Sequence, residues 1–426
     1  MIRVSGSDRS AWRELVRRPT LESSETLRDQ VRAILAEVEL DGDAALRRFA
    51  DKFDGVVPKD FRVSVNERDE VASRVPLELS RAIDLAIETI TRFHRSQVYT
   101  EPSVETLPGV VCWRKSIPIT RVGLYVPGGS APLFSTLVML GVPARIAGCQ
   151  EIVIATPIGA VGLPPAIAYV ARALAVEEIY TVGGAQALGA LSFGTDTIPA
   201  VQKIFGPGNR FVTEAKLQLA ARGYAIDLPA GPSEVLVIAD EDAAPAFVAA
   251  DLLAQAEHGP DSQVVLVTPS GTLADAVERE VEAQLRLLNR REVTEQALQK
   301  SLLVTVESLT EAMAFSNAYA PEHLILAVAA PEVLAPLVVN AGSVFLGYWS
   351  AEALGDYASG TNHVLPTGGQ ACAMSGVSVD SFCKKVTFQE VDRQGLVVLG
   401  QSVATMASAE GLDAHARAVT IRAERL

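Results

Sequence analysis

Apolar positions in the first part of the chain repeat at the spacing of an α-helix. Two sets, at positions 27, 31, 34, 35 and 38 and at positions 79, 83, 86, 87 and 90, would each lie on one helical face. Ser23 and Ser24 precede the first set and are candidates for its N-terminal cap. The chain up to about residue 95 is therefore predicted to be helical.

From residue 121 onward the pattern changes to short apolar runs separated by helical segments. The runs close at turn residues, as 122–126 does at Pro127-Gly128. This alternation predicts an α/β fold with mainly parallel sheets. After about residue 376 the strand pattern fades, and a helical tail is predicted. The predicted strands are residues 122–126, 151–155, 178–182, 235–239, 264–267, 324–327 and 344–346.

Length and charge narrow the class of protein. A chain of 426 residues is too long for one ordinary core, so two or more domains are expected. The net charge is −14 and no run of Lys or Arg stands out, which argues against nucleic acid or an anionic membrane as a partner. The apolar stretches are too short to span a bilayer, and the N-terminus carries no signal core. We expect a cytoplasmic protein.

The cysteines do not suggest a reactive site. Cys112, Cys149, Cys372 and Cys383 form no C-x-x-C pair, so neither a zinc ribbon nor a disulfide framework is indicated. Cys149 stands just before a predicted strand, where a small buried residue is expected. We therefore expect no covalent thioester chemistry.

Histidines near Gly and Pro are the main candidates for chemistry. Residues 247–261 are rich in Ala and Leu and end at Gly259-Pro260, the pattern of a helix and its stop signal. Gln255 and His258 are three residues apart, so they would share a face and could offer an oxygen and a nitrogen to one metal ion. The spacing alone favours an exposed polar face over a metal site.

An acidic and a basic residue stand side by side at the start of a later strand. Glu322 and His323 follow Pro321 and would supply two acid–base groups of different pKa. Neighbouring strand residues point to opposite faces, so both reach one substrate only if the backbone is irregular there. A capped, solvated loop is the alternative.

Two further regions hold candidate ligands. Asp356 lies in a polar, Gly-rich segment read as a loop, and could be an anionic metal ligand. Glu410 and His415 lie in the helical tail, only loosely on one face, so a solvated face is the alternative. The Gly-rich turns at 182–186 and 205–209 could hold an anion, yet no G-x-G-x-x-G fingerprint is present.

Longer motifs resemble histidinol dehydrogenases, most closely the proteobacterial type. The resemblance runs from near Leu27 to the C-terminus, and its motifs are long and specific. They are VGLYVPGGSAP from Val122, VGGAQA from Val182, IFGPGN from Ile204, IDLPAGPSE from Ile226, QAEHGPD from Gln255, PEHL from Pro321 and GDYASGTNHVLP from Gly355.

This resemblance implies an activity, its cofactors and its residues. The family oxidises L-histidinol through the aldehyde to L-histidine with two NAD, as a homodimer whose active site is shared between subunits. Each subunit would bind one Zn²⁺. The implied roles are zinc binding by Gln255, His258, Asp356 and His415; acid–base catalysis by Glu322 and His323; substrate binding by Ser233, Gln255, His258, His323, Asp356, His363, Glu410 and His415, with Glu410 and His415 coming from the partner subunit; and NAD binding by Tyr125, Gln186 and Asn209.

The resemblance also implies two incomplete Rossmann-like domains with helical extensions at both ends. We predict an N-terminal helical extension over 1–22 and a first α/β domain over 23–120 with 234–376. A second, NAD-contacting α/β domain would cover 121–233, and a helical tail 377–426.

Three other functions remain open at this point. The chain could be a zinc- and NAD-dependent dehydrogenase of another polar alcohol, because one fold hosts many substrates. The same ligands could serve a metallohydrolase with Glu322 as general base on water, or a metal-binding protein without activity.

Overall fold

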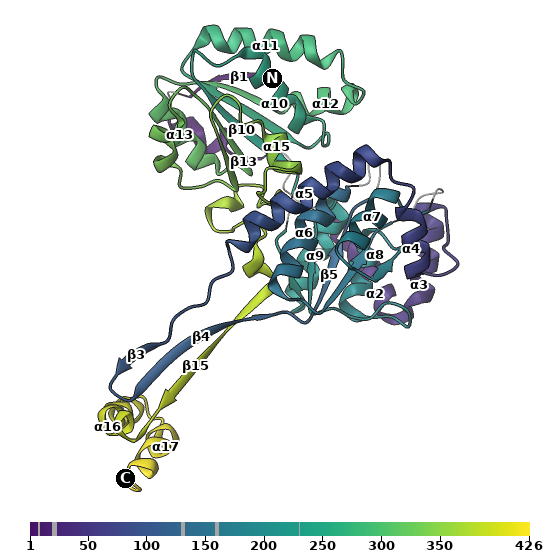
Figure 1. Cartoon of the computed structure of the whole chain (residues 1–426). Helices are drawn as coiled ribbons and strands as arrows, with labels where there is room; N and C mark the ends of the chain where they lie inside the picture. The colour runs from purple at the N-terminus through teal and green to yellow at the C-terminus, as the bar shows by residue number, and fades with distance from the viewer. Residues whose placement is uncertain (7–8, 19–23, 129–132, 158–161, 230) are drawn as a thin grey trace.

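Two α/β bodies and a long arm make up the computed structural model (Figure 1). It describes residues 1–6, 9–18, 24–128, 133–157, 162–229 and 231–426. The chain ends at the tip of the arm. Within the described ranges, no helix has both the length and the apolar character needed to cross a membrane.

The first body is built on a parallel sheet whose alternate side chains enter two cores. Val235 and Val237 face α10, α11 and α12, while Leu236 and Ile238 face α13 and α14. Buried on both sides, these strands are continuously apolar. The sheet order is β1 (Ile2–Ser5), β12 (Leu302–Thr305), β11 (Gln263–Thr268), β10 (Glu234–Ala239), β13 (His323–Ala327) and β14 (Ser343–Leu346). Its helices are α1 (Trp12–Leu15), α10 (Pro245–Ala256), α11 (Gly271–Leu285), α12 (Arg291–Leu298), α13 (Leu309–Tyr319), α14 (Pro331–Leu334) and α15 (Glu352–Tyr357).

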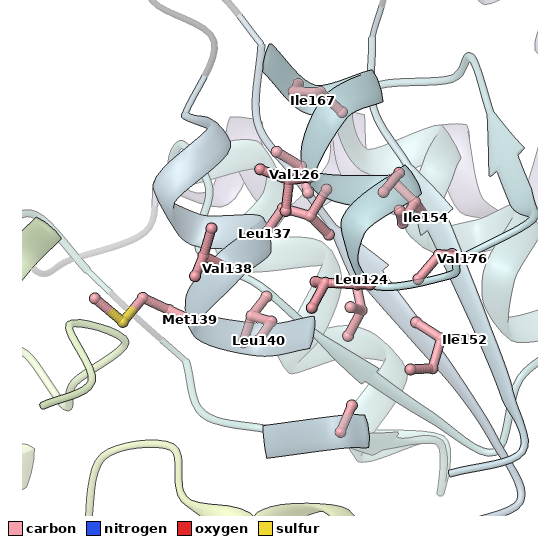
Figure 2. Close-up of a cluster of buried hydrophobic side chains, with 14 of the residues drawn as sticks. Leu124, Val126, Leu137, Val138, Met139, Leu140, Ile152, Ile154, Ile167 and Val176 are labelled. Carbon is pink, nitrogen blue, oxygen red and sulfur yellow. The ribbon is translucent and has the colours of Figure 1, made fainter. Parts of the chain in front are cut away.

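The second body repeats this plan. Figure 2 shows one of its cores, where Leu124 of β5 and Ile154 of β6 meet Leu137 of α6 and Ile167 of α7. The sheet order is β2 (Arg62–Val63), β7 (Glu178–Tyr180), β6 (Glu151–Ala155), β5 (Arg121–Tyr125), β8 (Lys203–Phe205) and β9 (Ala225–Ile226), with β2 antiparallel. Its helices are α2 (Glu25–Asp41), α3 (Asp43–Phe49), α4 (Val65–Ala72), α5 (Leu77–Arg95), α6 (Phe134–Ala147), α7 (Pro165–Ala173), α8 (Gly184–Phe193) and α9 (Arg210–Ala221).

The arm is a separate antiparallel sheet that ends in two helices. β4 (Val110–Pro118) pairs with β3 (Val104–Leu107) on one side and with β15 (Cys383–Val391) on the other. α16 (Arg393–Ala409) and α17 (Asp413–Ala423) follow at its tip, where Figure 1 shows them well away from both bodies. Val397 and Met406 of α16 are each 66% exposed.

The α/β fold with mainly parallel sheets and helices at both ends is confirmed. Each predicted strand is present within two residues of its bounds, and Ser24 caps α2 by accepting a hydrogen bond from Leu27 N at 3.2 Å. Ser23 and residues 19–22 of the predicted N-terminal extension lie outside the described residues.

Three parts of the predicted domain plan differ from the packing. Residues 25–95 pack their apolar faces on the sheet of the second body, and of the segment 234–376 it is the stretch around Val364 that joins this core. The N-terminal extension opens with β1, which pairs with β12. The tail is not all helical, since residues 383–391 form β15 with apolar and polar side chains that pair along β4.

Candidate functional site

The acid–base pair lies where α13 gives way to β13. Ala320 caps α13 in the left-handed region, with φ of 52°, and turns the chain so that His323 begins the strand. Both side chains of the pair meet the main chain of Glu234: Glu322 Oε2 accepts from Glu234 N at 2.8 Å, and His323 Nδ1 lies 3.1 Å from Glu234 O. The backbone is therefore irregular at this point, as it must be for both side chains to reach one substrate.

Carboxylates surround the His323 ring. Its Nε2 lies 3.5 Å from Asp356 Oδ1 and 3.8 Å from Glu352 Oε1, and its Nδ1 lies 3.7 Å from Glu322 Oε2. Burial lowers the pKa of His323, but these negative charges outweigh it and raise the pKa to about 10. Burial raises the pKa of Glu322 to about 8, although His323 opposes the shift. The pair is thus buried together and electrostatically coupled.

The end of α10 brings two predicted ligands to the same place. The Gln255 amide, turned so that both its atoms are satisfied, donates to Glu352 Oε1 at 2.6 Å and accepts from Glu234 N at 3.2 Å. His258 lies in the turn after α10, which ends at Ala256. Burial lowers the pKa of His258, and the negative charge of Asp356 opposes that shift.

The donor set fits a divalent cation. In the part of the chain that the structure describes, His323, Glu352 and Asp356 have ligand atoms within 4.8 Å of one another. Among these residues, His323 Nε2 and Asp356 Oδ1 are buried and have no hydrogen-bond partner. In the opposite orientation of the Gln255 amide, its oxygen would face the Glu352 carboxylate, and a cation bound between these two oxygens would stabilise that arrangement. Of the three, Asp356 is a predicted zinc ligand, whereas His323 was predicted as an acid–base residue and Glu352 was not predicted.

His363 links the site to the second body. Its Nδ1 lies 2.8 Å from the main-chain oxygen of Asp356, and its Nε2 lies 3.5 Å from Thr136 Oγ1 on α6. The adjacent Asn362 donates to Met139 O on α6 at 2.7 Å, which fixes the loop. Ser233 directly precedes β10 and Glu234, at the same edge of the sheet. These two predicted substrate residues therefore lie near the acid–base pair.

The three predicted cofactor residues line one cavity of about 520 Å³ in the second body. Tyr125 ends β5, and its hydroxyl accepts from Gly184 N at 3.1 Å; burial raises its pKa to about 12. Asn209 caps α9, and Gln186 lies in the first turn of α8. The cavity thus lies at the carboxyl ends of parallel strands and at helix N-termini, where α/β sheets bind ligands.

Two predicted residues are not brought to the site within one chain. Glu410 directly follows α16 as its C-cap and His415 lies in α17, both exposed at the tip of the arm. Figure 1 shows that tip far from β13 and α15.

Glu234 and Glu352 are buried neighbours of the pair that the sequence analysis missed. Nothing in the sequence distinguished Glu234 as a site residue, because it is only the last residue of the motif that begins at Ile226. Glu352 is four residues before Asp356, the spacing of one helical face, but it precedes the segment 355–366, which was read as a loop.

The fold and these two sites define an α/β protein with a cavity beside one sheet and a buried Glu–His pair beside the other. A family model for histidinol dehydrogenase matches residues 16–423. A histidinol dehydrogenase of Vibrio cholerae is 52% identical over 97% of this chain and 95% of its own length. One of Bacteroides fragilis is 51% identical over 98% of each chain.

A solved structure agrees with this result. The crystal structure of histidinol dehydrogenase from Elizabethkingia anophelis matches with a TM-score of 0.97 at 47% identity, covering 100% of this chain and 98% of that one. The chain belongs to the histidinol dehydrogenase family and is an oxidoreductase.

Proposed function

We propose that this chain oxidises L-histidinol through L-histidinaldehyde to L-histidine, using two NAD, as the last steps of histidine biosynthesis in the cytoplasm. The observation that carries the proposal is the convergence of Glu322, His323 and Asp356 at one buried point, in a member of this family. Family membership favours this reaction over the hydrolase and the inactive metal-binding protein.

Gln255, His258 and Asp356, with His415 of the partner subunit, would hold the Zn²⁺ ion. Two oxygen and two nitrogen donors suit a borderline divalent ion. The ion would orient the substrate by binding its polar groups, which lowers the entropic part of the barrier. A divalent charge would also offset the carboxylates around His323.

His323 would act as the general base on the alcohol. Because its Nδ1 contacts Glu234 O, one proton is held on that nitrogen. With the charge of the surrounding carboxylates offset by a bound divalent cation, Nε2 would be free to accept the substrate proton. NAD, when bound, accepts the hydride in each of the two oxidations. Glu322 would take a proton from the water that adds to the aldehyde, and a pKa of about 8 suits a group that accepts and returns protons near neutral pH.

One contact connects the elements that carry the two sites. Thr136 stands in the first turn of α6, which follows β5 and its cofactor residue Tyr125, and it contacts His363. Tyr125, Gln186 and Asn209 would hold NAD, while Ser233 and His363 would hold histidinol.

The arm supports a homodimer with a shared site. Isolated on its narrow sheet, it exposes apolar side chains on both helices, such as Val397, Met406 and Ile421. Exposed apolar surface of this kind is typical of a protein interface. Glu410 and His415 of the partner subunit would then complete the site with substrate and zinc contacts.

A direct test measures zinc content and NADH formation on one preparation. We expect about one zinc per chain and two NADH for each histidinol consumed. NADH from other polar alcohols but not from histidinol, or a metal-dependent hydrolysis without NAD, would contradict the proposal.

A further inference from the structure

A buried ion pair stands directly behind the acid–base pair. Arg18 chelates the Glu234 carboxylate, with Nε at 2.9 Å from Oε1 and Nη2 at 2.8 Å from Oε2. The two side chains are only 7% and 3% exposed. A bidentate, charge-assisted pair at this depth fixes the Glu234 side chain in position and orientation.

The cation of this pair is itself held from other sides. Its guanidinium carbon stacks 3.5 Å from the centroid of the Tyr319 ring, and Nη1 donates to Val16 O at 2.8 Å. The Tyr319 hydroxyl in turn donates to Gln263 Oε1 at 2.9 Å. On the other side, Gly368 N donates to Glu234 Oε1 at 3.0 Å. The carboxylate therefore has three donors and little freedom to move.

The main chain of the same residue carries the acid–base pair. On a strand, the N–H and C=O of one residue point to the same side, which for Glu234 is the side of β13. Glu234 N donates to Glu322 Oε2, and Glu234 O faces His323 Nδ1. One peptide segment thus orients the carboxylate and selects the ring nitrogen that is free for the substrate.

We propose that Arg18, through its ion pair with Glu234, is a positioning residue that aligns Glu322 and His323 for both oxidations. This inference rests on the proposed function of that pair. Arg18 is not one of the proposed substrate or cofactor residues, so its loss would lower kcat through misalignment. A displacement of about 1 Å in a reacting group can cost on the order of 100-fold in rate.

The main test replaces the fork of donors and keeps the charge. Arg18→Lys cannot chelate both oxygens, so we expect kcat per zinc-loaded, folded subunit to fall about 10- to 100-fold. The KM values for histidinol and NAD should stay within about threefold, because Arg18 lies outside the ligand sites. Zinc content should be unchanged.

Arg68 offers a matched control. It is also a buried arginine, 9% exposed in its side chain, that donates to Val176 O at 2.8 Å and pairs with Asp69 in the second body. Arg68→Lys should lose comparable thermal stability and keep the parent kcat. Equal kcat values for the two lysine variants, or a fall in Arg18→Lys that follows zinc loss, would overturn the proposal.

A second pair of variants keeps the idea testable if Arg18→Lys does not fold. Tyr319→Phe retains the ring beneath the guanidinium and should restore most of the kcat that Tyr319→Leu loses. A crystal structure of Arg18→Lys, or of Tyr319→Leu in its place, adds a readout independent of activity. Glu322 and His323 should move away from Glu234; an unmoved pair contradicts the proposal. If the parent enzyme forms no NADH from histidinol, the proposed function is refuted, whereas the positioning role of Arg18 is not.

Discussion

Individual side chains at the candidate site differ in which half of the reaction they serve. Glu322 is proposed to act on water and His323 on the alcohol. We therefore expect Glu322→Gln to lower the rate of aldehyde oxidation at least about 10-fold more than the rate of alcohol oxidation. The measurement is NADH formation from histidinol and from histidinaldehyde, supplied separately. Equal losses in both steps would remove Glu322 from the role of water activator.

Cys149 is the residue with which a covalent thioester mechanism can be tested. The thiol is 3% exposed, its Sγ lies 3.8 Å from Phe382 O, and burial raises its pKa to about 12. A thiol with so high a pKa is a poor nucleophile at neutral pH. We expect Cys149→Ala to keep activity within about twofold and to lose about 1 kcal/mol of stability.

The matched chemical test uses an alkylating agent at pH 8. Exposed Cys372 should react well before Cys149, as peptide mass spectrometry would show. Complete loss of activity in folded Cys149→Ala would favour a thioester after all.

Residue identities could be read from the sequence better than their surroundings. Glu322 and His323 stood out because two titratable groups follow a proline at a strand entrance. Glu234 and Arg18 did not, since their importance comes from contacts across 216 positions of sequence. A sequence pattern reports neighbours along a helix or strand, and such long-range partners lie outside it.

At the scale of elements, a buried ion pair stabilises the Gly-rich turn at 205–209, which carries the proposed cofactor residue Asn209. Lys216 of α9 donates to Gly206 O at 2.6 Å and lies 2.5 Å from Asp227, while Asp227 accepts from Gly206 N at 2.8 Å. Both main-chain polar groups of Gly206, in the turn after β8, are therefore hydrogen-bonded to this ion pair. We expect Lys216→Met to cost about 3–5 kcal/mol of unfolding free energy, because it leaves a buried carboxylate unpaired.

The same change should raise the KM for NAD more than the KM for histidinol. Urea unfolding and steady-state kinetics measure the two effects. The double variant Lys216→Met/Asp227→Leu serves as the control and should recover part of the lost stability, since it removes both charges. Unchanged KM for NAD in Lys216→Met would show that the turn does not contribute to the cofactor site.

Strands were predictable where burial made them continuously apolar, as in β10 and β11. β15 and β4 were missed because both faces of the arm are partly exposed, so their residues alternate irregularly. α15 was missed for a different reason: it is short and lies among Gly, Ser and Thr, so no periodicity could develop. Element prediction failed where tertiary packing, rather than local pattern, selects the conformation.

For the whole molecule, the prediction that residues 23–120 form a domain with 234–376 was wrong, because the sequence of a helix does not indicate which sheet the helix covers. α2 and α5 have an apolar face suited to either sheet, and only the structure assigns both to the second body. The arm poses the opposite case. It covers neither body, and its exposed apolar side chains argue for a second copy of the chain.

Subunit mixing tests the shared site at this scale. Glu322→Gln damages the site that its own chain builds, whereas His415→Asn should damage the site of the partner and release its zinc. In a heterodimer of the two variants, one site then receives both changes and the other receives none. Random reassociation should therefore restore about a quarter of the parent aldehyde-oxidising activity, because about half the dimers are mixed and each has one intact site of two.

Each variant refolded alone provides the baseline, and zinc analysis of His415→Asn checks the ligand role directly. If both residues served the site of their own chain, every site in the mixture would carry exactly one change. Mixing would then give no more than the average of the two variants, and His415 would have no role across the interface. Unchanged zinc content in His415→Asn would separately remove this residue from the ligand set while leaving the acid–base pair in place.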